Sequence, residues 1–352
     1  MNTALTTQVK ELLSAPKNCV IIGHKNPDGD AVGSCLGLDL YLKSIGQKSQ
    51  VVMPNDFPDF LKWLPSTDTI FNFEKQNTQA LQAIENADVI FTLDFNSLSR
   101  VGEMQATLEK SEAAFVMIDH HQQPDNYALI TYSDTTMGST CEMIFHFITA
   151  LEGQQHITPQ IATLLYTGIM TDTGSFRFPS TTAVTHRVIA SLIEHGAKNA
   201  EIHQNVYDTN SSSRIKLLGV ALDNLVVLEK YHTAYITISQ KELDDNNFKK
   251  GDTEGFVNYA LSVLGIVFAI IFIENKQENI VKISLRSKGD FSVNEFSIDK
   301  SYANNLRNKI GLLKSETKTK SAIMPQIIFF FPSSLYFSSP AFMINWTPPQ
   351  KK

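Results

Sequence analysis

The sequence predicts an α/β fold with a mostly parallel sheet and helices on both of its faces. In the first half of the chain, short apolar runs alternate with segments of helical periodicity. Acidic residues and histidines stand at the ends of several of these runs. Strands that alternate with helices are typical of parallel sheets. The 352 residues are enough for two domains, and a hydrophobic content of 43% can supply a core for each.

Five strands are predicted in the first half, and five helical patterns follow the first strand up to residue 196. The strand-like runs are "NCVIIGH", "KSQVVMP", "ADVIFTLD", "AAFVMIDHH" and "YALITYS". The helical patterns cover 30–45, 78–86, 138–151, 159–171 and 182–196. Pro159 suits a first helical turn and Gly196 suits a C-terminal stop, which supports the bounds of the last two helices.

The second half of the chain changes in character and predicts a smaller α+β domain. We expect a catalytic domain over 1–197, a polar helical linker over 198–230, the smaller domain over 231–296 and a poorly ordered tail over 297–352. The smaller domain contains a stretch without charges, 256–273, which Gly265 interrupts. Its apolar part is too short to span a membrane, so we predict a helix over 255–264 and a buried strand over 266–273.

Charge and cysteine usage narrow the class of protein. The net charge of −6 gives no general attraction for polyanions, so a phosphate-bearing ligand would need local cations. The three cysteines are far apart and show no CxxC spacing, which indicates a reducing compartment without a disulfide framework. The first residues lack the apolar core of a signal peptide and favour an amphipathic helix. We therefore expect a cytoplasmic protein that does not associate with membranes.

Candidate metal ligands follow the predicted strands. His24 ends the first strand, Asp94 ends "VIFTLD", and "DHH" (Asp119, His120 and His121) ends "FVMID". Parallel sheets bind ligands at the carboxyl ends of their strands, so we expect these side chains to meet at one edge. Asp28 and Asp30 lie in the loop "NPDGD" after the first strand, and Asp172 lies in "TDTGSFRF".

Together these residues predict a centre with two metal ions. Four carboxylates would repel one another strongly without cations. Mixed imidazole and carboxylate ligands suit Mn²⁺ or a similar ion, and their number exceeds the needs of one ion. The predicted ligands are His24, Asp28, Asp30, Asp94, His120 and Asp172, with Asp94 as the bridge.

Each of these residues also has a plain alternative explanation. "NPDGD" contains two turn signals, Asp94 could cap a helix, and Asp172 could cap a turn through "DTG". One of the two adjacent histidines could lie in the core and the other on the surface. The occurrence of all these residues together favours the metal centre.

Four motifs resemble those of the DHH phosphoesterase superfamily, in the order that the family has them. They are "HKNPDGDA", Asp94 at its strand end, "DHH", and "GIMTDTGSFRF". The resemblance covers roughly 7–296 and is closest to the branch of bacterial oligoribonucleases that also act as 3'-phosphoadenosine-5'-phosphate phosphatases. It implies that His24, Asp28 and Asp94 hold one Mn²⁺. The second Mn²⁺ would be held by Asp30, Asp94, His120 and Asp172, and Mg²⁺ or Co²⁺ are alternative metals.

The same resemblance implies roles for three further residues. His121 would contact the scissile phosphate and protonate the leaving oxygen, and Asp119 would orient a histidine. Arg100, in "FNSLSRVG", would lie near the substrate, or else be an ordinary surface arginine.

The second domain resembles the substrate-binding DHHA1 domain but departs from it at one point. "ISLRSKGDFSVNEF" matches its central strand and following helix, which makes Arg286 a candidate phosphate clamp. The family continues with a glycine-rich "GGGH"-type loop, whereas this chain has no histidine after His232 and no Gly-Gly pair in this region. A change of reading frame near Phe296, or a truncated and replaced C-terminus, would explain the difference, and resequencing would test it.

The sequence therefore predicts a phosphoesterase that hydrolyses short RNA oligonucleotides, adenosine 3',5'-bisphosphate, or both. Two metal ions would activate the attacking water. A cyclic or linear dinucleotide is an alternative substrate. The competing class is a catalytically impaired nucleotide-binding protein that lacks the glycine-rich loop. Expected partners are short single-stranded RNA or a small nucleotide, and a homodimer is left open.

Overall fold

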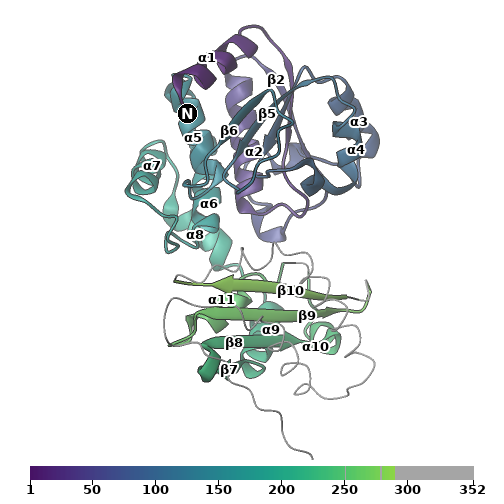
Figure 1. Ribbon diagram of the computed structural model, residues 1–352, viewed down its shortest axis with the longest axis vertical. Helices are drawn as coiled ribbons and strands as arrows, with labels where there is room; N and C mark the ends of the chain where they lie inside the picture. The colour runs from purple at the N-terminus through teal and green to yellow at the C-terminus, as the bar shows by residue number, and fades with distance from the viewer. Residues whose placement is uncertain (250, 278–279, 290–352) are drawn as a thin grey trace, which may run out of the picture. The chain divides into compact units, whose positions relative to one another are not determined.

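The computed structural model describes residues 1–249, 251–277 and 280–289 (Figure 1). These residues form two compact units, one over Met1–Thr209 and one that begins at Asn210. The predicted linker, 198–230, contributes one helix to each unit. The predicted tail, 297–352, lies outside the described residues, as does the end of the predicted second domain.

The first unit contains a six-stranded sheet in the order β3-β2-β1-β4-β5-β6, in which all neighbours are parallel. Its apolar runs form these strands because both faces of the sheet are covered, and every residue of β4 is buried. The α/β fold predicted from the sequence is confirmed. The strands are β1 (Asn18–Ile22), β2 (Lys48–Met53), β3 (Phe71–Asn72), β4 (Val89–Leu93), β5 (Ala114–Asp119) and β6 (Ile130–Ser133).

Helices pack on both faces of this sheet (Figure 1). Alternate residues of β4 belong to different cores: Phe91 packs with α2, α5 and α6, and Ile90 packs with α3 and α4. The helices of the unit are α1 (Thr3–Leu12), α2 (Gly29–Ser44), α3 (Asn77–Glu85), α4 (Gln105–Leu108), α5 (Thr140–Ala150), α6 (Pro159–Asp172), α7 (Ala183–Glu194) and α8 (Asn199–Tyr207).

Glycines bring α2 and α6 close together. A Cβ atom on Gly33 would lie 2.6 Å from the carbonyl oxygen of Leu164, and one on Gly37 would lie 2.8 Å from the side chain of Leu165. This close packing places the last residue of α6, Asp172, next to the first turn of α2.

The second unit contains a mixed four-stranded sheet in the order β10-β9-β8-β7. Strands β8 and β9 are parallel and the other pairs are antiparallel. The strands are β7 (Val226–Leu228), β8 (Thr233–Ile238), β9 (Phe268–Asn275) and β10 (Ile280–Ser287). Helices α9 (Ser212–Asp223), α10 (Gln240–Asp245) and α11 (Phe256–Ser262) share an apolar core with this sheet.

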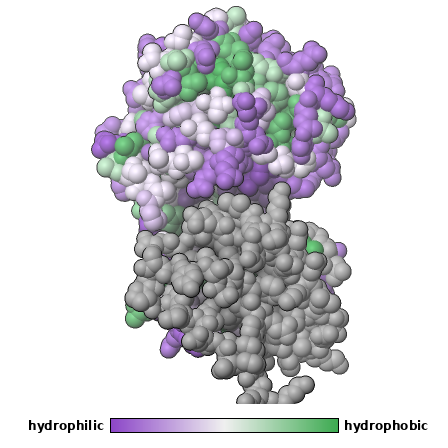
Figure 2. Space-filling view, viewed as in Figure 1, coloured by the Kyte–Doolittle hydropathy of each residue, from purple (hydrophilic) through white to green (hydrophobic). Residues whose placement is uncertain are grey.

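The uncharged stretch of the second unit is a helix followed by a strand, as the sequence predicts. It forms α11 and β9, and Gly265 between them has a φ of +79°, which glycine adopts without strain. Among the described residues, no helix is both long and apolar enough to cross a membrane. Figure 2 shows hydrophilic residues over much of the visible face of the first unit, with apolar side chains in smaller areas.

Candidate metal centre

The predicted ligands converge at the carboxyl edge of the first sheet. Strands β1, β4 and β5 are neighbours, and they lead directly to His24, to Asp94 and to the "DHH" stretch. Asp94 has a φ of +66°, a left-handed conformation that aspartate tolerates better than most residues. Its backbone N–H donates to the carbonyl oxygen of Ile118 at 3.2 Å, which ties the end of β4 to β5.

The "NPDGD" stretch is both a turn and part of the candidate site. Asp28 caps α2, because its Oδ1 accepts hydrogen bonds from the backbone N–H groups of Asp30 and Ala31 at 3.0 and 3.1 Å. Its Oδ2 lies 3.9 Å from Nε2 of His24. The turn therefore leaves one oxygen of Asp28 facing a predicted metal ligand.

Three groups of three residues among the described residues could each hold a metal ion. The first triad is His24, Asp28 and Asp94, and the second triad is Asp30, His120 and Asp172. In each triad, the candidate ligand atoms all lie within 4.8 Å of one another. Asp94, His120 and His121 satisfy the same criterion.

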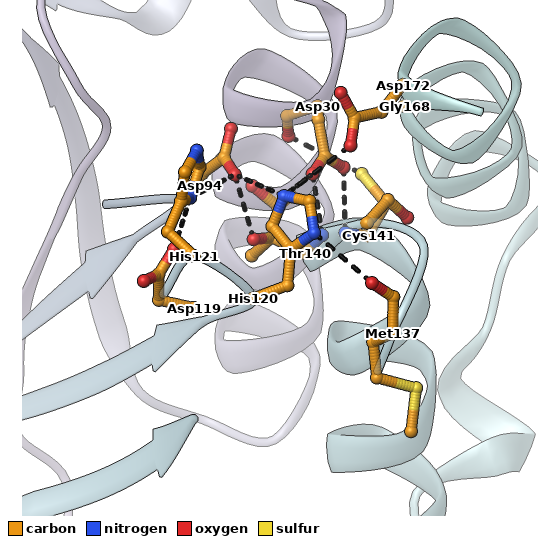
Figure 3. Close-up of polar contacts among 12 residues, drawn as sticks. Asp30, Asp94, Asp119, His120, His121, Met137, Thr140, Cys141, Gly168 and Asp172 are labelled. Atoms are coloured by element: carbon orange, nitrogen blue, oxygen red, sulfur yellow. Dashed lines mark hydrogen bonds and ion pairs between the residues drawn. The ribbon is translucent and has the colours of Figure 1, made fainter. Parts of the chain in front are cut away.

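Asp94 faces both triads with different oxygens. Its Oδ2 lies 3.5 Å from Nε2 of His24. Its Oδ1 lies 3.5 Å from Nε2 of His120, and Figure 3 shows these two side chains. Nε2 of His120 also lies 3.5 Å from Oδ2 of Asp172 and 3.9 Å from Oδ2 of Asp30. This arrangement suits a carboxylate that bridges two cations.

Both histidines of the triads present Nε2 to the carboxylates. Nδ1 of His24 lies 3.0 Å from the carbonyl oxygen of Lys25, and Nδ1 of His120 lies 3.3 Å from that of Met137. A carbonyl oxygen only accepts hydrogen bonds, so each Nδ1 is the donor. A histidine whose second nitrogen donates to a carbonyl is the usual form of a metal ligand.

His121 has a different environment. Its Nδ1 lies 2.7 Å from Oδ1 of Asp119, whose side chain is fully buried. Its ring meets that of His120 edge-on, with the centroids 4.7 Å apart (Figure 3). Asp119 therefore orients the ring of His121 through its Nδ1.

The carboxylates of the site raise the pKa values of its two triad histidines and of Asp172. Burial lowers the pKa of His24, but contacts with Asp94 and Asp28 outweigh it and raise that pKa to about 9. The same balance, with Asp94 and Asp30 as the main partners, raises the pKa of His120 to about 10. Burial and repulsion by Asp94 raise the pKa of Asp172 to about 7.

The pKa values of two buried carboxylates of the triads, Asp30 and Asp94, shift in opposite directions. Burial, together with repulsion from Asp94 and Asp172, raises the pKa of Asp30 well above its usual range. Burial also acts to raise the pKa of Asp94, but the two facing histidines hold it well below its usual range. A site that crowds carboxylates in this way fits divalent cations, which would replace the protons.

The remaining predicted residues lie apart from the triads. Arg100 is exposed in the 3-10 helix η3 (Leu98–Met104), and its carbonyl oxygen accepts from the N–H of Lys25 at 2.8 Å. Its loop is thereby tied to the loop that carries His24. Arg286 is exposed on β10 of the second unit. For both arginines, a role in substrate binding stays a prediction.

The contribution of α5 to the site was not predicted from the sequence. Backbone N–H groups at its start bond to Asp30, and the hydroxyl of Thr140 bonds to Asp94. The sequence "STCE" carried a signal for this helix start, because Ser-x-x-Glu is a capping pattern. Ser139 does cap α5, accepting from the N–H of Glu142 at 3.1 Å.

Comparison with known proteins agrees with this geometry. Residues 18–169 match the DHH family, N-terminal domain. The chain is similar to the bifunctional oligoribonuclease and PAP phosphatase NrnA of Thermus thermophilus, with 30% identity over 82% of each chain. This chain belongs to the DHH family. It is an enzyme that hydrolyses phosphoester bonds, as the sequence predicts.

Two further DHH relatives cover most of the chain. The protein of the same name from Bacillus subtilis is 27% identical over 81% of this chain and 86% of the relative. A solved structure of an exopolyphosphatase-related protein from Bacteroides fragilis superposes with a TM-score of 0.82 and 36% identity. The match covers 85% of this chain and 87% of the solved chain, so the likeness includes described parts of both units.

Proposed function

We propose that this chain hydrolyses short RNA oligonucleotides and the 3'-phosphate of adenosine 3',5'-bisphosphate, with two Mn²⁺ ions as cofactors. The observation that carries the proposal is Asp94, which turns one carboxylate oxygen to each triad. The names of the similar proteins from Thermus thermophilus and Bacillus subtilis support these two substrates.

The two triads assign the candidate ligands to two ions. His24, Asp28 and Asp94 would hold one ion, and Asp30, Asp94, His120 and Asp172 would hold the other. When bound, the pair would supply Lewis acidity to the phosphoryl group and lower the pKa of the attacking water. Imidazole combined with carboxylate favours Mn²⁺, and Mg²⁺ and Co²⁺ are the alternatives to test.

His121 would give a proton to the leaving oxygen. Its Nδ1–H bond to Asp119 leaves Nε2 as the nitrogen that holds the transferable proton. The buried carboxylate of Asp119 would keep the ring orientation through the transfer. The side chain of His121 is 35% exposed, so a substrate can reach it.

The acidic chain needs local cations to hold a nucleotide. Arg100, on the loop tied to Lys25, would contact a phosphate close to the first triad. Arg286, exposed on β10, is the candidate phosphate contact of the second unit. The chain has no glycine-rich stretch where the family carries its substrate loop. The contribution of the second unit to substrate binding is therefore the part of the proposal that most needs an experiment.

The proposal is tested with three substrates in the presence of Mn²⁺: a labelled RNA dinucleotide, adenosine 3',5'-bisphosphate and a p-nitrophenyl phosphate ester. We expect all three to be hydrolysed. Hydrolysis of the small ester alone would favour the impaired nucleotide-binding protein, and no hydrolysis despite bound Mn²⁺ would overturn the proposal. A cyclic dinucleotide assayed beside them tests the alternative substrate.

A further inference from the structure

The start of α5 contacts two buried carboxylates of the triads, Asp30 and Asp94. The backbone N–H of Thr140 donates to Oδ2 of Asp30 at 2.6 Å, and that of Cys141 donates to Oδ1 of Asp30 at 2.8 Å. The hydroxyl of Thr140 donates to Oδ1 of Asp94 at 3.0 Å (Figure 3). Thr140 is fully buried, and Asp30 and Asp94 are 1% and 2% exposed.

The two amides fix the rotation of the Asp30 carboxylate. The first N–H groups of a helix have no partner within the helix, and they carry a partial positive charge. Here each of them takes one oxygen of Asp30, so the carboxylate cannot rotate without breaking a buried hydrogen bond. Each oxygen keeps a second lone pair, which remains available to a cation.

The hydroxyl of Thr140 fixes Asp94 in a corresponding way. It bonds the same oxygen, Oδ1, that faces His120, and this leaves Oδ2 to face His24. A carboxylate that has lost this bond could turn about its Cβ–Cγ bond and present its oxygens differently to the two histidines. The hydroxyl thus selects the orientation in which each triad receives one oxygen.

The start of α5 is itself held in place. Ser139 caps the helix, and Oε2 of the buried Glu142 accepts from the hydroxyl of Thr185 on α7 at 3.0 Å. Sγ of Cys141 packs against Gly168 of α6, where a Cβ atom would collide with it. Because contacts with α6 and α7 hold this turn of α5, Thr140 can hold Asp94 at a defined angle before any cation binds.

We infer that Thr140 is a positioning residue of the metal centre, which orients Asp94 so that one carboxylate oxygen serves each triad. The inference rests on the proposed two-metal function. Thr140 lies outside all four motifs that indicated the site in the sequence, and its hydroxyl acts through Asp94 rather than on the substrate.

The test compares Thr140→Val, which keeps the shape and removes the hydroxyl, with Thr140→Ser, which keeps the hydroxyl. The matched control is Thr167→Val, because Thr167 is also fully buried. Among the described residues, the hydroxyl of Thr167 donates only to the carbonyl oxygen of Thr163, within α6. Calorimetric titration with Mn²⁺ measures the number of ions bound and their affinity. Electron paramagnetic resonance of the loaded protein reports the magnetic coupling between two Mn²⁺ ions.

We expect T140V to weaken Mn²⁺ binding by about 10–100-fold, the range seen when partners of metal ligands are removed. The coupling signal should change, and kcat for the small ester should fall more than KM. T140S should restore most of the affinity, and T167V should match the unmodified protein. If T140V does not fold, T140S and Thr140→Ala give the same comparison of hydroxyl present and absent.

The failures of the two proposals are distinguishable. If the unmodified protein does not bind two Mn²⁺ ions, the two-metal function is wrong, and the inference falls with it. If the unmodified protein binds two ions and T140V keeps its affinity and coupling signal, only the inference is wrong. A T140S variant as impaired as T140V would also overturn the inference, because the hydroxyl would then not be the cause.

Discussion

The two triads of the metal centre are built in different ways. The first takes His24 and Asp28 from a single loop, and the side chain of Asp28 is 46% exposed. The second takes Asp30, His120 and Asp172 from three distant segments, and the side chain of Asp30 is 1% exposed and held by α5. Two of the three residues of the first triad thus lie in one loop, and Asp94 joins them from the end of β4, whereas all three residues of the second come from separate segments that the packing of the unit brings together.

This difference has an energetic consequence. Removing the partly exposed carboxylate of Asp28 should change metal binding with little effect on the fold, since exposed groups contribute little to stability. Removing one from the buried triad also disturbs buried hydrogen bonds, which are costly to leave unmade. Variants of the ligands can test this contrast, and the residue that joins the two triads should matter most.

Asp94→Asn should have the largest effect, because it affects both triads at once. We expect hydrolysis of the small ester to fall by roughly 10³-fold, as when a group that stabilises transition-state charge is lost. Asparagine also tolerates the left-handed backbone at this position, so the fold should persist. Steady-state kinetics and circular dichroism measure the two effects. Undiminished turnover would refute the bridging role of Asp94.

Asp28→Asn and Asp30→Asn should separate the triads. Each variant should lose one bound Mn²⁺ and about 10²-fold in activity. Asn is as good a helix cap as Asp, so D28N should keep its free energy of unfolding without metal. The amide of an asparagine has only one oxygen, so it cannot accept hydrogen bonds from the two α5 N–H groups on separate oxygens. The free energy of unfolding of D30N should therefore fall by about 1–3 kcal/mol. Urea unfolding of the two variants tests the contrast, and equal stabilities would contradict it.

Metal binding should depend on pH in the opposite sense to metal-free stability. His24, with a pKa of about 9, and His120, with a pKa of about 10, hold protons at neutral pH that a metal ion must displace. Mn²⁺ affinity should therefore rise with pH up to about 9–10. The protonated rings stabilise the metal-free protein, and this stabilisation is complete below pH 6.5. It is lost as the pH rises through the raised pKa values of about 9 and about 10.

The second triad should release more protons than the first. It contains His120 and also Asp172, whose pKa is raised to about 7, and Asp30, whose pKa is raised as well. D28N, which retains the second triad, should release more protons per Mn²⁺ than D30N. Calorimetry in buffers of different ionisation enthalpy counts these protons, and an equal release would remove the distinction between the triads.

Gly168→Ala should produce the smallest effect and only at the second triad. The added Cβ would meet Sγ of Cys141 and lie 3.0 Å from Oδ1 of Asp30. We expect a loss of about 1–3 kcal/mol in the free energy of unfolding, together with weaker Mn²⁺ binding. Gly219→Ala in α9 is the control, because a Cβ there would meet no neighbouring side chain or segment within 4 Å, and it should gain about 0.5–1 kcal/mol. A Gly168→Ala variant as stable as this control would show that α5 and α6 can move apart freely.

Much of the first unit could be predicted from the sequence because its signals are local. The apolar runs that form β1, β2, β4, β5 and β6 are bounded by turn residues, and helical periodicity marks α2, α3, α5, α6 and α7. The short strand β3 and the four-residue helix α4 carry too few residues for a period to show. The tail after Phe296 gave no such signal, and it lies outside the described residues.

The chain order alone determined which side chains reach the carboxyl edge of the sheet. A residue that follows a parallel strand emerges at that edge whatever the details of packing, and this placed His24, Asp94 and His120 together. Only the tertiary structure decided how the carboxylates are turned. The donors to Asp30 come from residues 110 and 111 positions later in the chain, and no local pattern records such a contact. The angle of Asp94 likewise depends on the position of α5, which the packing of three helices sets.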